Sequence, residues 1–254
     1  MSRRASIVAW TLQRIIRPPQ RVWTDWRVLN EAPRPASAQM ARDVELAREP
    51  VLTLRVFRWD PPAISLGWKQ PRPAWLDGAD RSAATLDIVE RPTGGGIAFH
   101  GSDVSVSVIV PRALNLSLDF VMCSTTRVAA MLCRSYGIEA HTSAHERHDR
   151  RVTYCLAEAS SYAVWIGARK VAGFSVRRYP QTWLIHGSLF VQPLPEVLVQ
   201  ALPQEVLEPL TSHAASLSDA VGRRLDPQDV AQRWADHWTS WWDDALLTAL
   251  EVVG

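Results

Sequence analysis

Cysteine is scarce in this chain, and long hydrophobic runs are absent. Only three of the 254 residues are cysteine, which is too few for a secreted disulfide scaffold, so a reducing, cytoplasmic location is expected. No apolar run has the roughly 20 residues needed to cross a bilayer, so no integral membrane segment is expected. The formal net charge is only +2, and without a basic stripe a nucleic-acid partner is not expected.

Lysine is also scarce. The chain has 28 lysines plus arginines, and only Lys69 and Lys170 are lysine, so 26 of these residues are arginine. A planar guanidinium cannot replace a compact ammonium at a tight site. The two lysines are therefore stronger candidates for functional residues. The alternative for each is that lysine remains at this position by chance.

Neither an internal repeat nor an evident linker divides the sequence, and its hydrophobic content of 47% supplies one core. Five arginines precede the first acidic residue, Asp25. Residues 1–22 are therefore interpreted as a basic N-terminal extension, and residues 23–254 as a single domain. A transit peptide or a membrane-surface helix is the alternative for such an arginine-rich, acid-poor start.

Short apolar runs separated by turn residues predict strands. Residues 51–59 and 63–68 are expected to pair as a hairpin around the turn Asp60-Pro61-Pro62. Residues 103–110 alternate small polar and branched apolar residues, which predicts a strand with one buried face. Further strands are predicted at residues 86–91, 97–100, 162–166, 169–176 and 183–191. Gly167-Ala168 suits a tight turn between two of them.

Helical spacing appears before, between and after these strands. A helix is predicted over residues 38–49, and another begins at the capping residue Ser117 and ends near Tyr136. The last long helix is predicted from Pro227 to about Leu250, and its four tryptophans are expected to face the core. Together the elements predict an α+β (mixed α/β) fold of largely antiparallel sheets flanked by helices.

Four polar segments stand out against this framework. They are E-R-P-T-G-G-G-I-A-F-H (90–100), Y-C-L-A-E-A-S-S-Y (154–162), G-A-R-K-V-A-G-F-S (167–175) and H-G-S-L-F-V (186–191). Three adjacent glycines let backbone N–H groups approach a ligand closely. The glycine-rich segment 90–100 lacks both the P-loop and the dinucleotide-binding pattern. If this segment stood alone, a glycine-rich turn that binds no ligand would be the better interpretation.

Taken in order, the four segments resemble the lipoate-protein ligase, octanoyltransferase and biotin ligase superfamily, and most closely its cysteine-dependent LipM-type octanoyltransferases. The resemblance runs from about Val28 to Val191. It includes R-V-F-R-W-D-P-P-A-I-S-L-G-W-K-Q, which is similar to the opening hairpin of the family. It implies a fold like the biotin/lipoate protein ligase catalytic domain.

The resemblance also implies roles for particular residues. Cys155 falls at the position of the nucleophile, and Lys170 at that of the lysine that polarises the acyl group. An ammonium favours a neighbouring thiolate and stabilises a developing oxyanion. The implied substrate-binding residues are Arg91, Thr93, Gly94, Gly95, Gly96, His100, Gly173, Ser175, His186 and Gly187. Cys123 and Cys133, inside a predicted helix, are interpreted as inert buried thiols.

The implied reaction moves an octanoyl or lipoyl group from a thioester such as octanoyl-acyl carrier protein, through acyl-Cys155, to a lysine. The acceptor is a lipoyl domain or the glycine cleavage H protein. No cofactor and no metal are implied, and His145 and His148 are interpreted as part of a solvated loop. The alternatives are an ATP-dependent lipoate-protein ligase, which needs ATP and Mg²⁺, and a non-catalytic relative that binds acyl or lipoyl-domain partners.

Two departures from the family pattern concern substrate identity. Gly173-Phe174-Ser175-Val176 stands where relatives usually read G-S-A-Q, which predicts a narrowed or reshaped acyl pocket. Gly101 replaces the aspartate that usually follows His100, and Asp103 comes slightly later.

Overall fold

The computed structural model describes residues 25–77, 86–143, 153–155 and 157–251. The basic extension predicted for residues 1–22 lies outside these residues, and so do His145 and His148. No helix among the described residues is long and apolar enough to span a membrane.

Two sheets organise the described residues. The larger has seven strands in the order β1-β2-β6-β10-β9-β8-β7, and the smaller has the order β4-β3-β5. The strands of the larger sheet are β1 (Arg27–Asn30), β2 (Thr53–Phe57), β6 (Asp103–Pro111), β7 (His141–Thr142), β8 (Ala163–Ile166), β9 (Arg169–Arg178) and β10 (Thr182–Phe190). Those of the smaller sheet are β3 (Ala63–Leu66), β4 (Asp87–Glu90) and β5 (Ala98–His100). Only β1–β2 and β3–β4 pair in parallel, which confirms the largely antiparallel prediction.

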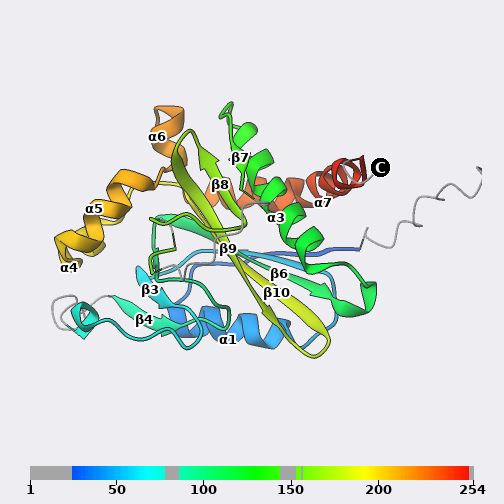
Figure 1. Ribbon diagram of the computed structural model, residues 1–254, viewed down its shortest axis with the longest axis horizontal. Coiled ribbons are helices and arrows are strands. Elements are labelled where there is room, and N and C mark those ends of the chain that lie inside the picture. Colours follow the sequence, from blue (N-terminus) through cyan, green and yellow to red (C-terminus); the bar gives the residue numbers. More distant parts are fainter. Residues whose placement is uncertain (1–24, 78–85, 144–152, 156, 252–254) are drawn as a thin grey trace, which may run out of the picture.

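Helices cover both faces of the larger sheet, with α1 on one side and α3 and α7 on the other (Figure 1). The helices are α1 (Ala36–Leu46), α3 (Leu118–Arg134), α4 (Glu196–Ala201), α5 (Gln204–His213), α6 (Leu217–Val221) and α7 (Pro227–Glu251), with a 3₁₀ turn η1 (Arg112–Leu114). The predicted cap of α3 is confirmed, because Ser117 Oγ accepts a hydrogen bond from the Phe120 N–H at 3.1 Å.

The hairpin predicted between residues 51–59 and 63–68 is wrong. The two strands form, but β2 pairs with β1 and β6, whereas β3 pairs with β4 and β5 in the other sheet. Between them, Pro61 and Pro62 have no N–H to donate to a ladder. The chain therefore leaves the first sheet at this turn and enters the second.

Strand β6 also differs from its prediction, because all nine of its residues are buried. Its valine face packs into the main core under α3 and α7. Its serine face lies toward α1, where Ser107 Oγ donates a hydrogen bond to Asp43 Oδ1, which also accepts from Arg55. Small polar residues thus fill a second interior layer instead of facing water.

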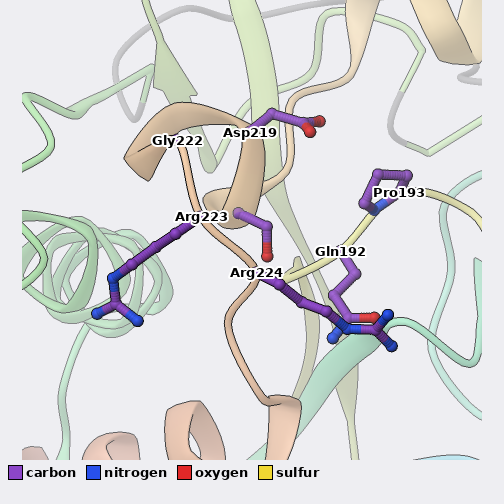
Figure 2. Close-up of a pocket in the computed structure, with 7 residues that line it drawn as sticks. Gln192, Pro193, Asp219, Gly222, Arg223 and Arg224 are labelled. Atoms are coloured by element: carbon purple, nitrogen blue, oxygen red, sulfur yellow. The ribbon is translucent and has the colours of Figure 1, made fainter.

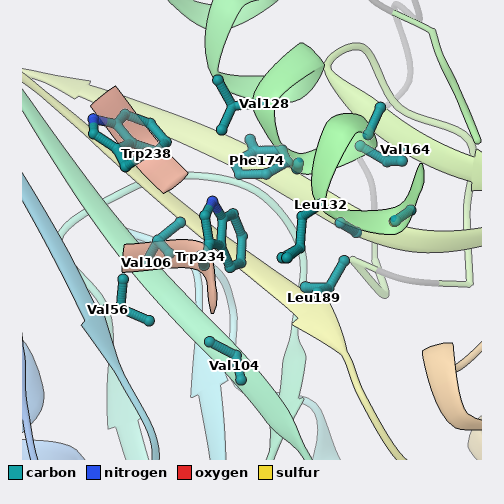
Figure 3. Packing of buried hydrophobic residues seen from close by; sticks show 14 of the residues in the cluster. Val56, Val104, Val106, Val128, Leu132, Val164, Phe174, Leu189, Trp234 and Trp238 are labelled. Carbon is teal, nitrogen blue, oxygen red and sulfur yellow. The ribbon is translucent and has the colours of Figure 1, made fainter. Parts of the chain in front are cut away.

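The four tryptophans of α7 face the core, as predicted, although Trp241 is only half-buried. Trp234, Trp238 and Trp242 are fully buried. Trp234 and Trp238 belong to the same core cluster as Phe174 and the valines of the sheet (Figure 3). Trp26 packs edge-on against Trp238 with ring centroids 5.2 Å apart. Aromatic burial of this extent anchors α7 firmly to the sheet.

The predicted tight turn between β8 and β9 is confirmed. Gly167 adopts a φ of +57°, which favours glycine, and Ile166 pairs with Arg169 across the turn. The hairpin places Lys170 near the start of β9, beside the segment that contains Cys155.

Candidate active site

A short irregular segment holds Cys155 against the smaller sheet. The Cys155 N–H donates to the Ile97 carbonyl at 2.8 Å, and the Ile97 N–H donates to the Thr153 carbonyl at 2.7 Å. The Glu158 carboxylate accepts hydrogen bonds from the N–H groups of Thr153 and Tyr154, both at 2.8 Å. Because Ile97 directly follows the three glycines, these bonds tie the cysteine segment to the glycine loop.

Lys170 reaches into this segment from β9. Its side chain is fully buried, and its Nζ donates to the Cys155 carbonyl at 2.5 Å, the Glu158 carbonyl at 3.1 Å and Ser160 Oγ at 2.6 Å. An ammonium has three N–H donors, so all of them are used. Burial lowers the pKa of Lys170, and its attraction to Cys155 and Glu158 opposes that shift.

Gly173 lies against both the sulfur of Cys155 and the ammonium of Lys170. A Cβ built on this residue would lie 3.3 Å from Cys155 Sγ and 3.3 Å from Lys170 Nζ. Both groups therefore converge on one point of β9, as the sequence predicted. A side chain at this position would press against the pair, so glycine keeps the approach to the sulfur open.

The glycine loop is organised from within by Arg91. This buried guanidinium donates to the carbonyls of Gly94 at 2.8 Å, Gly96 at 2.5 Å and Ser65 at 3.0 Å. Gly95 has a φ of +90°, which favours glycine. Burial lowers the pKa of Arg91, and attraction to Cys155 opposes the shift. A second buried cation therefore lies near the thiol.

A small cavity lies beside the sulfur. Its volume is about 20 Å³, room for about one water molecule, so an acyl chain has to displace lining side chains or lie outside it. The lining residues are Ser65, Arg91, Ala98, His100, Cys155, Gly173, Ser175, His186, Gly187 and Ser188. The structure thus brings seven of the predicted site residues together.

The other predicted residues do not line this cavity. Thr93 is buried behind it, where its Oγ1 accepts a hydrogen bond from Ser175 Oγ at 3.0 Å. Lys170 lies against Gly173 next to Cys155 without lining the cavity, and the carbonyls of Gly94 and Gly96 accept hydrogen bonds from the Arg91 guanidinium. Ser65 and Ser188 were missed, because a serine inside a strand carries no distinctive sequence signal.

Phe174 does not line this cavity, and its predicted effect on an acyl pocket stays a prediction. Side chains alternate along a strand, so Gly173 and Ser175 face the cavity while Phe174 points into the core toward α3 (Figure 3). Phe174 pairs across the sheet with Gly187, and a Cβ on Gly187 would lie 2.2 Å from the ring. The ring occupies the space that a larger residue at 187 would need.

Asp103 forms a chain of hydrogen bonds with two cavity residues. Its Oδ2 lies 2.8 Å from His100 Nδ1, and His100 Nε2 lies 2.8 Å from Ser65 Oγ. Burial raises the pKa of Asp103, but interactions with His100 and Ser188 outweigh that effect and lower it overall. The aspartate that follows His100 three residues later is therefore positioned to orient its ring.

His186 is buried in the same cavity without a polar contact. Among the described residues, neither ring nitrogen has a hydrogen-bond partner. The ring lies near those of Phe57 and Trp59, with centroids 5.8 Å and 6.4 Å away. Burial first, and then repulsion from Arg91, lower the pKa of His186 well below 6.5. The ring is therefore neutral at pH 7.

This neutral histidine predicts a loss of stability in acid. Below pH 6.5 the unfolded chain binds a proton at His186 that the folded chain does not, so the free energy of unfolding decreases as pH falls. The contribution is about 1.4 kcal/mol per pH unit. Urea unfolding between pH 7.5 and 5 should therefore show a weaker pH dependence for His186→Gln than for the wild type. His213→Gln, at an exposed position in α5, is the control, and equal slopes in all three proteins would contradict the prediction.

A larger, open pocket of about 490 Å³ lies elsewhere, around the end of α6 (Figure 2). Its lining shares no residue with the cavity beside Cys155. Two arginines contribute to it, but the side chains of Arg223 and Arg224 extend to opposite sides. They therefore do not converge on one point, as binding of a single anion requires.

Comparisons with known proteins show which family the chain resembles. Residues 36–239 match the lipoyl protein ligase A/B catalytic domain family. Octanoyltransferase LipM of Symbiobacterium thermophilum is 31% identical over 233 residues, covering 84% of each chain. Octanoyltransferase LipM of Kyrpidia tusciae is 28% identical, covering 83% of this chain and 85% of that protein.

Solved structures support the fold. A lipoate-protein ligase A bound with ATP superposes with a TM-score of 0.65 at 15% identity, covering 89% of this chain and 94% of that one. A bi-partite lipoate protein ligase from Thermoplasma acidophilum, studied with its E2 lipoyl domain, gives a TM-score of 0.62 at 16% identity, covering 90% and 92%. The matched residues, the relatives and the shared fold agree: the chain belongs to the lipoyl protein ligase A/B catalytic domain family.

Proposed function

We propose that this chain is an octanoyltransferase that moves an octanoyl group from a thioester donor to the lysine of a lipoyl domain. Relatives that carry the octanoyltransferase name match more than four fifths of the chain. The observation that carries the proposal is the convergence of Cys155 Sγ and Lys170 Nζ on Gly173. A thiol between two buried cations suits acyl transfer through a thioester.

In the first step, the Cys155 thiolate attacks the thioester carbonyl of octanoyl-acyl carrier protein. A carbon–sulfur bond to Cys155 forms, the bond to the carrier sulfur breaks, and the carrier leaves as a thiolate. Positive charge at Lys170 and Arg91 favours the attacking thiolate and the negative oxygen of the tetrahedral intermediate.

In the second step, the amine of the acceptor lysine attacks the octanoyl-Cys155 thioester. An amide bond forms, the bond to Cys155 breaks, and the sulfur leaves as a thiolate ready for another turnover. The first step exchanges one thioester for another and the second converts a thioester into a more stable amide, so the proposed reaction needs neither ATP nor a metal. The glycine cleavage H protein is an acceptor of the same kind.

The proposal is tested by weighing intact proteins after mixing the chain with octanoyl-acyl carrier protein and an apo lipoyl domain, without ATP. We expect one octanoyl group on the lipoyl-domain lysine and, when the acceptor is omitted, one on Cys155. Transfer that requires lipoic or octanoic acid together with ATP and Mg²⁺ would instead identify a ligase. Binding of the lipoyl domain without transfer under either condition would identify a non-catalytic relative.

A further inference from the structure

We propose that Ser65, His100 and Asp103 form a proton relay that accepts the proton of the acceptor lysine during the second step. The inference rests on the proposed transfer through Cys155 and assigns the proton acceptor that this reaction needs. Three observations carry it: the hydrogen-bonded chain, its position in the cavity beside Cys155, and the occupied donors of Lys170.

The second step requires a base. An amine that attacks a thioester becomes positively charged and has to lose a proton before the amide is formed. In the proposed relay Lys170 keeps its proton, because an ammonium can donate to the Cys155 and Glu158 carbonyls and to Ser160 Oγ at once and then has no lone pair with which to accept another.

The geometry of the three residues suits the role of the base. Asp103 Oδ2 accepts a hydrogen bond from His100 Nδ1, so Nε2, 2.8 Å from Ser65 Oγ, is the ring nitrogen available to take a proton. Ser65 Oγ accepts one hydrogen bond from Arg91 at 3.2 Å, so its hydroxyl proton is free to point toward His100. Ser65 also lines the cavity beside Cys155. An aspartate, a histidine and a hydroxyl in this order form a proton-withdrawing chain.

The ring of His100 is held by a stacked tryptophan and by its carboxylate partner. Trp59 stacks on it with centroids 4.0 Å apart and an interplanar angle of 18°. The Trp59 indole N–H donates to Ser105 Oγ at 2.9 Å, and Ser105 Oγ donates to Asp103 Oδ2 at 2.9 Å. The ring, its carboxylate and its stacking partner therefore form one connected unit.

The two histidines of the cavity have different environments. His100 contacts both the Asp103 carboxylate and the Ser65 hydroxyl, whereas neither ring nitrogen of His186 has a polar partner among the described residues. Burial and the nearby Arg91 also lower the pKa of His186 well below 6.5. Of the two histidines, only His100 is therefore connected to a hydroxyl that lines the cavity.

The protons balance over one turnover. As the carbon–nitrogen bond forms, the amine proton passes to Ser65 Oγ, and the proton of Ser65 passes to His100 Nε2. The electron pair of the breaking carbon–sulfur bond stays on Cys155. His100 later returns the proton through Ser65 to the carrier thiolate released from the next donor. The net products are the amide and the free carrier thiol.

Single-turnover measurements on octanoyl-Cys155 protein test the relay. Each variant is acylated with octanoyl-acyl carrier protein, separated from it, and mixed with saturating apo lipoyl domain or with hydroxylamine. Hydroxylamine is much less basic than lysine, so the nitrogen of its adduct is more acidic and gives its proton to solvent water without help from the protein. For Ser65→Ala we expect transfer to the lipoyl domain to slow about 100-fold, while the reaction with hydroxylamine stays within about threefold of the wild-type rate.

Ser124→Ala is the matched control, because Ser124 is buried in α3 and its hydroxyl has no hydrogen-bond partner among the described residues. Both of its rates should equal those of the wild type. Equal slowing of Ser65→Ala with both acceptors, unchanged transfer to the lipoyl domain, or failure of this variant to be acylated would each overturn the relay. If the wild type itself never carries octanoate on Cys155, the proposed function fails instead.

Discussion

Replacing Cys155 by alanine should abolish the octanoyl adduct on the protein and reduce transfer to the lipoyl domain by about 10⁴-fold or more. The loss should be this large because no other thiol lies in the cavity among the described residues. Without the sulfur, the donor thioester has to react directly with the acceptor amine. Intact-protein mass spectrometry and the initial rate of lipoyl-domain acylation measure the two effects.

Cys123→Ala is the matched control for this loss. Cys123 is a buried thiol of α3, and burial raises its pKa, so it is not a thiolate at neutral pH. We expect this variant to transfer octanoate at the wild-type rate. Transfer by Cys155→Ala at a rate near that of the wild type, without ATP, would contradict the acyl-enzyme.

Replacing Lys170 by methionine should slow transfer by about 10²–10³-fold, the usual effect of removing one group that stabilises an oxyanion. Methionine has a similar length but no charge. The variant therefore loses the cation beside Cys155 and leaves the three acceptors of the ammonium without their donor. Stopped-flow rates of Cys155 acylation measure the chemical effect, and urea unfolding measures the loss of stability.

Two further variants separate the charge of Lys170 from its shape. Lys170→Arg retains a positive charge but replaces the compact ammonium by a planar group, so we expect it to recover only part of the rate. Lys69→Met removes the other lysine, which is exposed, and should leave the rate unchanged. A Lys170→Met protein that folds and is acylated at the wild-type rate would show that the cation is not needed.

Local signals in the sequence predicted much of the fold and part of the candidate site. Ser117 caps α3, Gly167 turns β8 into β9, and the tryptophans of α7 face the core, because each effect depends on neighbours in sequence or on one periodicity. The meeting of Cys155 with Lys170 followed from the expected hairpin and the family resemblance.

Tertiary arrangement set the limits of those predictions. Nothing local distinguishes a strand that pairs with its neighbour from one that enters a second sheet, so the separation of β2 from β3 was missed. The serines of β6 resembled a solvent-facing row, yet they are buried under α1. The contact of Ser65 with His100 joins residues 35 positions apart, which no local pattern encodes.

The contact between Phe174 and Gly187 has a consequence for engineering this protein. The Phe174 ring of β9 fills the space that a side chain at Gly187 of β10 would occupy, so the side-chain volumes at these two positions are coupled. A designer who enlarges residue 187 has to shrink residue 174 in the same step. Because residues 173 and 175 belong to the same strand and line the cavity beside Cys155, the strain of a mismatched swap would reach the sulfur of Cys155.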